Sequence, residues 1–185
     1  GDEVPSIDRA ARAGVDAIIV PAIEAAYFER VLDLARRHDA LYAALGLHPI
    51  VIEHHLDEHL DRLDAVLQTA EKKLVAIGEI GLDLYRENPQ FERQQTILDA
   101  QLRLAKHHDP PVILHSRRTH DMLAMHPNRI ALSRWGAAHG FPDTLQLAQR
   151  FAVLAYHSAF GATITYTPPP KTLAGTPRLP LPPLP

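Results

Sequence analysis

The chain contains no cysteine, and this absence excludes both a disulfide framework and a zinc site built from thiolates. Any metal must therefore be held by histidine, aspartate or glutamate, a set that suits hard or borderline divalent ions. No stretch approaches the roughly 18 consecutive apolar residues of a membrane-spanning helix, and residues 1–5 lack a basic segment before an apolar run. We therefore expect a soluble, cytoplasmic protein that makes no membrane contact.

A strong excess of one charge is also missing. The formal net charge of the 185 residues is −3, which argues against a broad basic surface but leaves room for a local phosphate site. A glycine-rich nucleotide fingerprint is absent too, because Gly78 and Gly81 lack the required spacing and a following glycine. What is present is 46% hydrophobic residues, enough for the core of one ordinary domain, and 12 histidines.

Short apolar segments alternate with amphipathic helical segments along residues 1–166. We predict strands at residues 16–20, 41–47, 74–78, 112–114, 137–141 and 161–166. Helices are predicted at residues 7–13, 28–35, 56–67, 91–105, 119–125 and 145–151. In the helix at 91–105 the apolar residues mark the buried side, and the glutamines, arginines and aspartate are expected on the outer side. The alternation, at about 30 residues per unit, predicts right-handed βαβ units and an α/β fold in which flanking helices cover a parallel sheet.

The composition changes after Tyr166, where eight of the 16 prolines lie between Pro168 and Pro185. Proline neither donates to a sheet ladder nor continues a helix. We therefore divide the chain into a domain at 1–166 and a proline-rich tail at 167–185 that is expected to be disordered. A polyproline segment that docks to a partner is the alternative.

Three polar side chains follow apolar strands where these are predicted to end: Glu79, His115 and His139. Because the carboxyl ends of parallel strands meet at one edge of a sheet or barrel, we expect the three to converge. One carboxylate and two imidazoles form a suitable ligand set for Zn²⁺ or a similar ion, which makes a water nucleophile available for hydrolysis. In the alternative interpretation, Glu79 is a solvated strand end and the histidines bond only to the backbone.

Four further side chains are candidates at the same edge. Arg117 and Arg118 are expected to bind an anionic substrate, since guanidinium groups grip phosphate oxygens bidentately; the alternative is surface cations at a helix start. Asp83 either orients a metal-binding histidine or caps the turn before the next helix. His48 is expected to touch the substrate.

Another group of histidines, His54, His55 and His59, is expected to lie on a solvated helix. His55 and His59 have the i, i+4 spacing of a helical metal pair. The glutamate does not directly follow the first of them, so the metalloprotease motif is absent.

Four motifs stand out: LGLHP at 45–49, GEIGLD at 78–83, PQFERQQ at 89–95 and PVILHSRRTHD at 111–121. Together they resemble the TatD family of metal-dependent deoxyribonucleases, and in particular its YjjV-like branch. The combination of Gly-Glu-x-Gly-Leu-Asp with a later Leu-His-Ser-Arg is specific. The likeness is expected to cover about residues 1–151.

The resemblance implies an incomplete (β/α) barrel of the amidohydrolase type, with about six parallel strands. It also implies a two-metal site for Mg²⁺, Mn²⁺ or Zn²⁺ that hydrolyses phosphodiester bonds in DNA, with 3'-5' exonuclease activity at strand ends. By this likeness Glu79 bridges the two ions and acts with Asp83 in catalysis, while His115 and His139 complete one ion. The region of Arg117 faces the phosphate.

Two motifs of the family are missing, a His-x-His pair on the first strand and an Asp in a Thr-Asp-Ala-Pro segment on the last. Pro142 and Asp143 replace the family's Ser/Thr-Gly. We therefore expect one or two ions, two unprotected sheet edges, and weakened or lost activity in a truncated chain. One alternative is an inactive scaffold that binds nucleic-acid ends or a protein partner. Another is a related hydrolase of amides or lactones, which the two arginines disfavour.

Overall fold

A computed structural model of the chain describes residues 3–119, 121–123, 132, 136–139 and 156–158. Within these residues six strands form one sheet, and every neighbouring pair is parallel. The order of the strands in the sheet follows the chain: β1 (Ile18–Pro21), β2 (Leu41–Leu45), β3 (Leu74–Asp83), β4 (Val112–Arg117), β5 (Gly136–His139) and β6 (Tyr156–Ser158).

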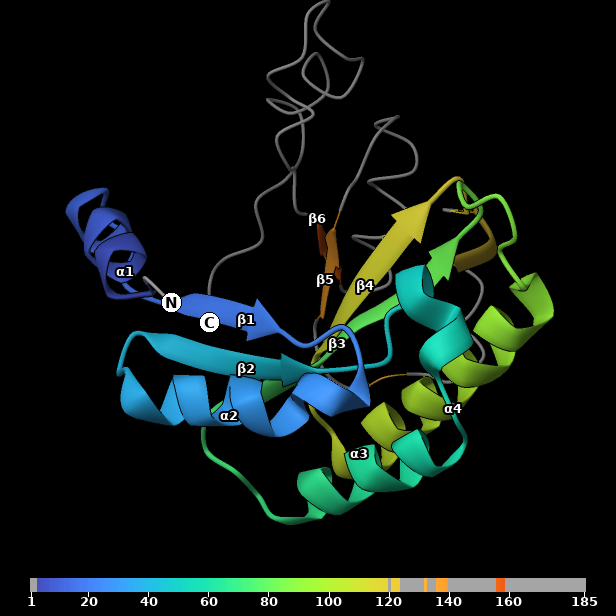
Figure 1. Ribbon diagram of the computed structural model, residues 1–185, viewed down its shortest axis with the longest axis horizontal. Helices are drawn as coiled ribbons and strands as arrows, with labels where there is room; N and C mark the ends of the chain where they lie inside the picture. Colours follow the sequence, from blue (N-terminus) through green and yellow to red (C-terminus); the bar gives the residue numbers. More distant parts are fainter. Residues whose placement is uncertain (1–2, 120, 124–131, 133–135, 140–155, 159–185) are drawn as a thin grey trace, which may run out of the picture.

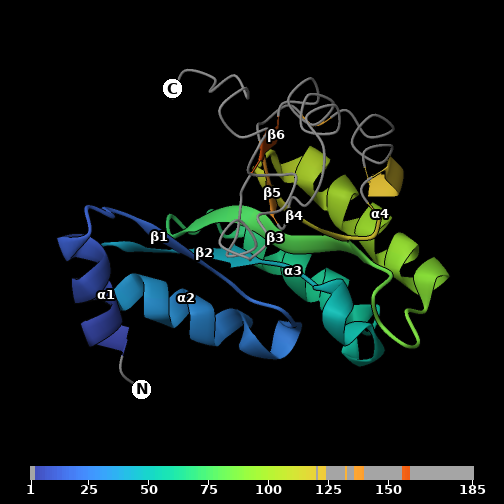
Figure 2. The ribbon, with the colours of Figure 1, turned by 90° about the horizontal axis from the view of Figure 1, so that it is seen from above.

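The helices α2 (Phe28–Arg37), α3 (Glu58–Gln68) and α4 (Phe91–His108) link the first four strands and lie against the outer side of the curved sheet (Figures 1 and 2). Two short 3₁₀ helices, η1 (Ala25–Tyr27) and η2 (Pro49–His54), follow β1 and β2. The fold is an incomplete (β/α) barrel with flanking helices, as predicted. No helix in the described part of the chain combines the length and apolarity needed to cross a bilayer.

The first helix, α1 (Glu3–Arg12), lies beside the start of β1 and buries none of its residues (Figure 1). It ends because Gly14 adopts a φ of 81°. The N–H groups of Gly14 and Val15 then donate to the carbonyls of Ala11 and Ala10, 3.0 Å away in each case. This is a Schellman ending, which glycine permits at little steric cost.

The core lies between the sheet and the helices. The helix α2 buries the i, i+3, i+4, i+7 set predicted from its sequence: Phe28, Val31, Leu32 and Ala35. Full burial of one large apolar side chain contributes about 1.5–3 kcal/mol, so this stripe is sufficient to dock α2 on the sheet. The strands and α4 supply most of the remaining core, including Leu45, Ile77, Ile80, Leu82, Leu114, Ile97, Leu98 and Leu102.

The end of β3 differs from the prediction. The strand does not stop at Gly78 but continues to Asp83, because the two glycines allow β4 to approach closely instead of breaking the strand. A Cβ at Gly81 would lie 1.9 Å from the carbonyl oxygen of His115. The strand β4 is also longer than predicted and ends at Arg117, so Glu79 and His115 lie within strands and do not follow them.

Three other predictions were wrong. Leu56 precedes α3 and is 53% exposed, because the helix begins at Glu58. His55 is buried and ends η2, so it does not share a solvated helix with His59. Gln94 and Gln101 are buried in α4, although glutamine was expected on its outer side. The predicted strand at 161–166, the helix at 145–151 and the tail at 167–185 lie outside the described residues.

Candidate metal centre

His48 leaves the sheet just after β2, and hydrogen bonds hold both its backbone and its ring. Its N–H donates to the carbonyl of Ile23 over 2.9 Å, and its carbonyl accepts from Nε2 of His55 over 2.8 Å. Its Nδ1 accepts from the N–H of Ile50 over 3.0 Å, so His48 caps η2. Because Nδ1 acts as an acceptor, the neutral ring carries its proton on Nε2.

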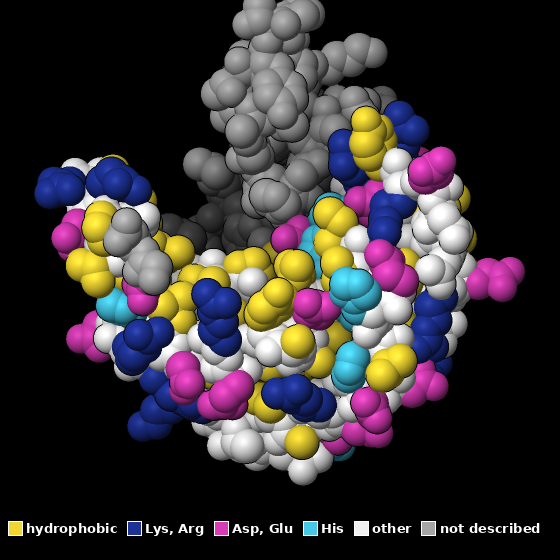
Figure 3. All heavy atoms as spheres, in the orientation of Figure 1, with side chains coloured by type: hydrophobic (Ala, Val, Ile, Leu, Met, Phe, Trp, Pro, Cys, Tyr) yellow, Lys and Arg dark blue, Asp and Glu magenta, His cyan; other side chains and the backbone are white. Residues whose placement is uncertain are grey.

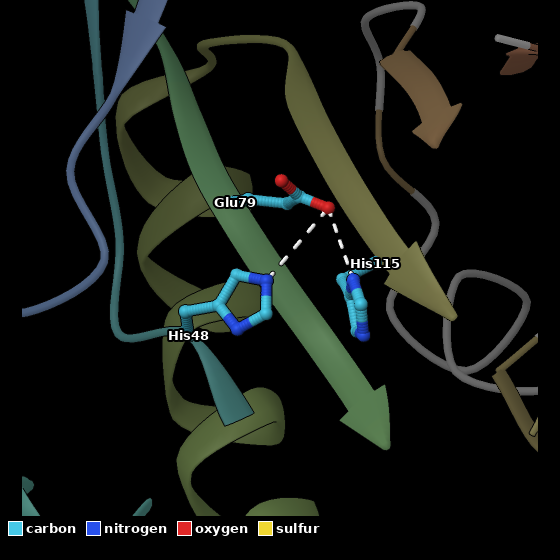
Figure 4. Close-up of side chains that lie close together, drawn as sticks. All are labelled: His48, Glu79 and His115. Carbon is cyan, nitrogen blue, oxygen red and sulfur yellow. Dashed lines mark hydrogen bonds and ion pairs between the residues drawn. The ribbon is translucent and has the colours of Figure 1, made fainter. Parts of the chain in front are cut away.

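Glu79 lies on β3 at an irregularity in the ladder with β4. Ile77 pairs with Val112 and Ile80 pairs with Leu114, so β3 contains one extra residue between these two pairs. Such bulges are frequent beside functional sites, where they re-aim a side chain. The Glu79 carboxylate is 14% exposed and lies close to the rings of both His48 and His115 (Figure 4).

The imidazole of His115 lies between two carboxylates. Its Nδ1 is 3.1 Å from Oε1 of Glu79, and its Nε2 is 3.1 Å from Oδ2 of Asp83. Asp83 ends β3, is 2% exposed in its side chain, and accepts from the N–H of Tyr85 through its other oxygen. A buried carboxylate on the far nitrogen of a ring is the partner that usually orients a metal-binding histidine.

Burial and the two carboxylates shift the pKa values in this group. Burial alone would lower the pKa of His115, but its hydrogen bonds to Glu79 and Asp83 outweigh this effect and raise the pKa. Burial would raise the pKa of Glu79, but the hydrogen bonds and charges of His115 and His48 lower it far below its usual range. Glu79 is therefore ionised in the folded chain, and its carboxylate is available to hold a cation.

His48, Glu79 and His115 converge on one point, although they come from a loop and two different strands (Figure 4). One ligand atom from each lies within 4.8 Å of the others, and the two imidazole rings have centroids 4.4 Å apart. Nε2 of His48 is 3.8 Å from Oε1 of Glu79. Two imidazoles and a carboxylate at this separation fit a divalent ion such as Zn²⁺ or Mn²⁺.

The structure thus brings together Glu79 and His115 from the predicted ligand set, with His48 beside them. His139 ends β5, and the strand register pairs its backbone with that of His115. The side chain of His139 lies outside the described part of the chain.

Arg117 and Arg118 lie at the exit of β4 and are both exposed. The guanidinium carbon of Arg117 is 3.5 Å from the centre of the Tyr85 ring, and that of Arg118 is 4.8 Å from it. Stacking on an aromatic face restrains a guanidinium group while its N–H groups stay available. Tyr85 was not predicted, and its place two residues after Asp83 in the GEIGLD motif was the available signal.

Comparison with known proteins places the chain in a family. A family model described as "TatD related DNase" matches residues 1–183, further along the chain than the expected limit near residue 151. The chain is 56% identical over 181 residues to a protein of Escherichia coli K12 named "Uncharacterized metal-dependent hydrolase YjjV", covering 98% of this chain and 70% of that protein. It is 36% identical over 126 residues to a protein of Pantoea ananatis named "3'-5' ssDNA/RNA exonuclease TatD", covering 66% and 47% of the two chains.

A solved structure of YjjV, described as a TatD homologue from Escherichia coli K12, has the same fold. The two superpose with a TM-score of 0.94 at 56% identity, covering 97% of this chain and 70% of that one. The chain therefore belongs to the TatD-related DNase family of metal-dependent hydrolases, and to its YjjV-like branch.

Proposed function

We propose that this chain is a metal-dependent phosphodiesterase that cleaves DNA single strands from the 3' end. The convergence of His48, Glu79 and His115 within 4.8 Å is the observation on which the proposal rests. The name of the Pantoea ananatis relative, a 3'-5' exonuclease of single-stranded DNA and RNA, supports the choice of substrate.

We assign Glu79 and His115 as ligands of the ion, with His139 as the third. Asp83 accepts from Nε2 of His115 and so leaves Nδ1, on the Glu79 side, to face the ion. A bound Mg²⁺, Mn²⁺ or Zn²⁺ stabilises the charge that develops on the phosphate and makes a water nucleophile available. The family resemblance implies two ions at such a site; here Glu79 would contribute to holding one or two.

His48 is assigned to the substrate. Its Nδ1 accepts from Ile50, so the neutral ring offers an N–H at Nε2, and an N–H donates to a phosphate oxygen and does not bind a metal.

Arg117 and Arg118 are assigned to the phosphate groups of the strand. No carboxylate in the described part of the chain forms an ion pair with either guanidinium, whereas Arg86 and Arg93 are paired with Glu53 and Asp57. On the face shown in Figure 3, basic and acidic side chains are interspersed. Local recognition by two stacked arginines therefore suits this surface better than a broad basic track.

The assay follows release of nucleotides from a single strand labelled at its 5' end, with Mg²⁺, Mn²⁺ or Zn²⁺ added and with a chelator as control. Stepwise shortening from the 3' end that stops with the chelator supports the proposal. Divalent binding without cleavage of any phosphodiester would instead favour an inactive scaffold that binds strand ends. Cleavage of amide or lactone substrates alone would overturn the assignment to nucleic acid.

A further inference from the structure

Two glutamine side chains of α4 each form hydrogen bonds with both the N–H and the carbonyl of a single residue. Gln94 accepts from the N–H of Asp83 over 2.8 Å and donates to the carbonyl of the same residue over 2.9 Å. Gln101 bonds to Leu47 in the same way: it accepts from the N–H of Leu47 over 2.7 Å and donates to its carbonyl over 3.2 Å. Both glutamines are almost completely buried, at 1% and 0% exposure.

Each carboxamide occupies the place where a neighbouring strand would pair. The ladder between β2 and β3 ends at the pair of Leu45 and Ile77, so Leu47 and Asp83 both lie beyond it. A carboxamide has one accepting oxygen and N–H donors, as a peptide group does, and can satisfy the N–H and the carbonyl of one residue together. An unpaired backbone group at these buried positions would cost stability, so the glutamines replace a missing strand.

Each glutamine and the backbone residue to which it bonds form a unit that we call a clamp. Both clamps adjoin the candidate metal centre. Leu47 directly precedes His48, and the Asp83 carboxylate accepts from His115. Gln94 and Gln101 are two turns apart on one rigid helix, at a separation of about 10 Å along its axis. Because α4 bonds to the backbones of both Leu47 and Asp83, it fixes the position of the segment that carries His48 relative to Asp83 and its partner His115.

We propose that Gln94 and Gln101 are positioning residues. Gln94 holds Asp83, the partner of the ligand His115, and thereby sets the affinity of the site for a divalent cation. Gln101 holds the backbone next to His48 and thereby sets the place of this substrate-binding ring beside the cation. This inference rests on the proposed metal centre. Neither glutamine touches the cation or the substrate, so each acts through the backbone that it holds, and Gln94 also donates to the carbonyl of Pro89.

The test compares three variants of the full chain. Gln94→Met and Gln101→Met remove both hydrogen bonds of each clamp at nearly constant side-chain volume. Leu102→Ala is the matched control, because Leu102 is buried next to Gln101 in the core and its loss destabilises the fold without removing a clamp. Calorimetric titration with Mn²⁺, well below the unfolding temperature, should show the dissociation constant rising about tenfold or more in Gln94→Met and less than about twofold in Gln101→Met and in the control. Gln101→Met should instead raise KM for a single-stranded DNA substrate about tenfold or more, and an unchanged KM in this variant would overturn its role.

A second measurement needs no variant and no metal. In the wild-type chain, NMR couplings across the hydrogen bonds should link the Leu47 nitrogen to Cδ of Gln101 and the Asp83 nitrogen to Cδ of Gln94. Their absence would overturn the proposal even if the methionine variants fail to fold, and so would equal losses of Mn²⁺ affinity in Leu102→Ala. If the wild-type chain binds no divalent cation, the proposed function fails, and with it the role in affinity, whereas intact couplings would show that the clamps themselves exist.

Discussion

His55 donates a hydrogen bond from Nε2 to the backbone carbonyl of His48 over 2.8 Å, and its own Nδ1 is buried without a partner among the described residues. Burial is the main effect on this ring, and it lowers the pKa of His55 below the usual 6.5. The folded chain therefore favours the neutral form of His55, whose ring holds the backbone of His48 at the candidate metal centre.

Replacing His55 with glutamine should reduce the amount by which the free energy of unfolding falls in mild acid. A base with a lowered pKa binds fewer protons in the folded chain than in the unfolded one, so its contribution to stability falls as the pH drops below about 6.5. The glutamine side chain keeps an N–H donor for the His48 carbonyl but does not titrate. Urea unfolding at about pH 7.5 and pH 5 measures the slope, with the exposed His107→Gln as control; equal slopes in wild type and His55→Gln would contradict the prediction.

Glu79→Gln should abolish tight binding of a divalent cation. The substitution preserves the size of the side chain but removes the charge that faces His48 and His115. We expect Mn²⁺ affinity to fall by more than about a hundredfold, since loss of a direct ligand exceeds the tenfold to hundredfold effect of an outer partner. Calorimetry measures the affinity, and Glu53→Gln, an exposed carboxylate paired with Arg86, should leave it unchanged.

Cation binding should release protons, and affinity should rise with pH. Although burial opposes it, the hydrogen bonds to Glu79 and Asp83 raise the pKa of His115, so near neutral pH the ring carries a proton more often than an ordinary histidine. A cation at Nδ1 must displace that proton, and the competition disappears once the pH exceeds the raised pKa. Titration calorimetry in two buffers of different ionisation enthalpy counts the protons; identical apparent enthalpies would refute the competition.

Arg117→Ala should weaken binding of DNA while sparing the metal. The guanidinium group is restrained on Tyr85, so its loss removes a positioned phosphate partner rather than a freely moving charge. We expect KM for a single-stranded substrate to rise about tenfold or more, with the metal content unchanged. Arg103→Ala, an exposed arginine on α4, is the control, and an unchanged KM in Arg117→Ala would count against phosphate recognition.

Gly81→Ala should be far more damaging than Gly14→Ala, although both glycines have positive φ values. A Cβ at Gly14 meets nothing within 4 Å, so only the backbone cost of about 1–2 kcal/mol applies. A Cβ at Gly81 would collide with the His115 carbonyl and displace β4, for which we expect a loss above about 3 kcal/mol together with weaker Mn²⁺ binding. Urea unfolding ranks the two variants, and comparable losses would show that β4 moves away easily.

Much of the fold was predictable, because it depends on local apolar patterns. The stripe of α2, the alternation of strands with helices and the parallel sheet all follow from residue spacing. The end of β3 did not, because a glycine that breaks a strand and a glycine that admits a neighbouring strand look alike in sequence. Only the packing of β4 against Gly81 distinguishes them.

The candidate site was predictable where strand order decides it. Glu79 and His115 converge as expected because β3 and β4 are parallel neighbours. The tautomer of His48 and the burial of His55 depend on hydrogen bonds from separate loops, which spacing does not reveal. Gln94 and Gln101 are seven residues apart, and this interval places both on the same side of α4 as its apolar residues. Their burial could therefore have been predicted from the sequence.

The strands stand in the sheet in the order in which the ribosome makes them. Each βα unit that leaves the exit tunnel therefore meets an edge that has already formed, and none of the six described strands is inserted between two earlier ones. His48, Glu79 and His115 are all present once the chain has emerged as far as Arg117. A nascent chain of that length already carries two of the assigned ligands, Glu79 and His115, whereas the third, His139, follows only with β5.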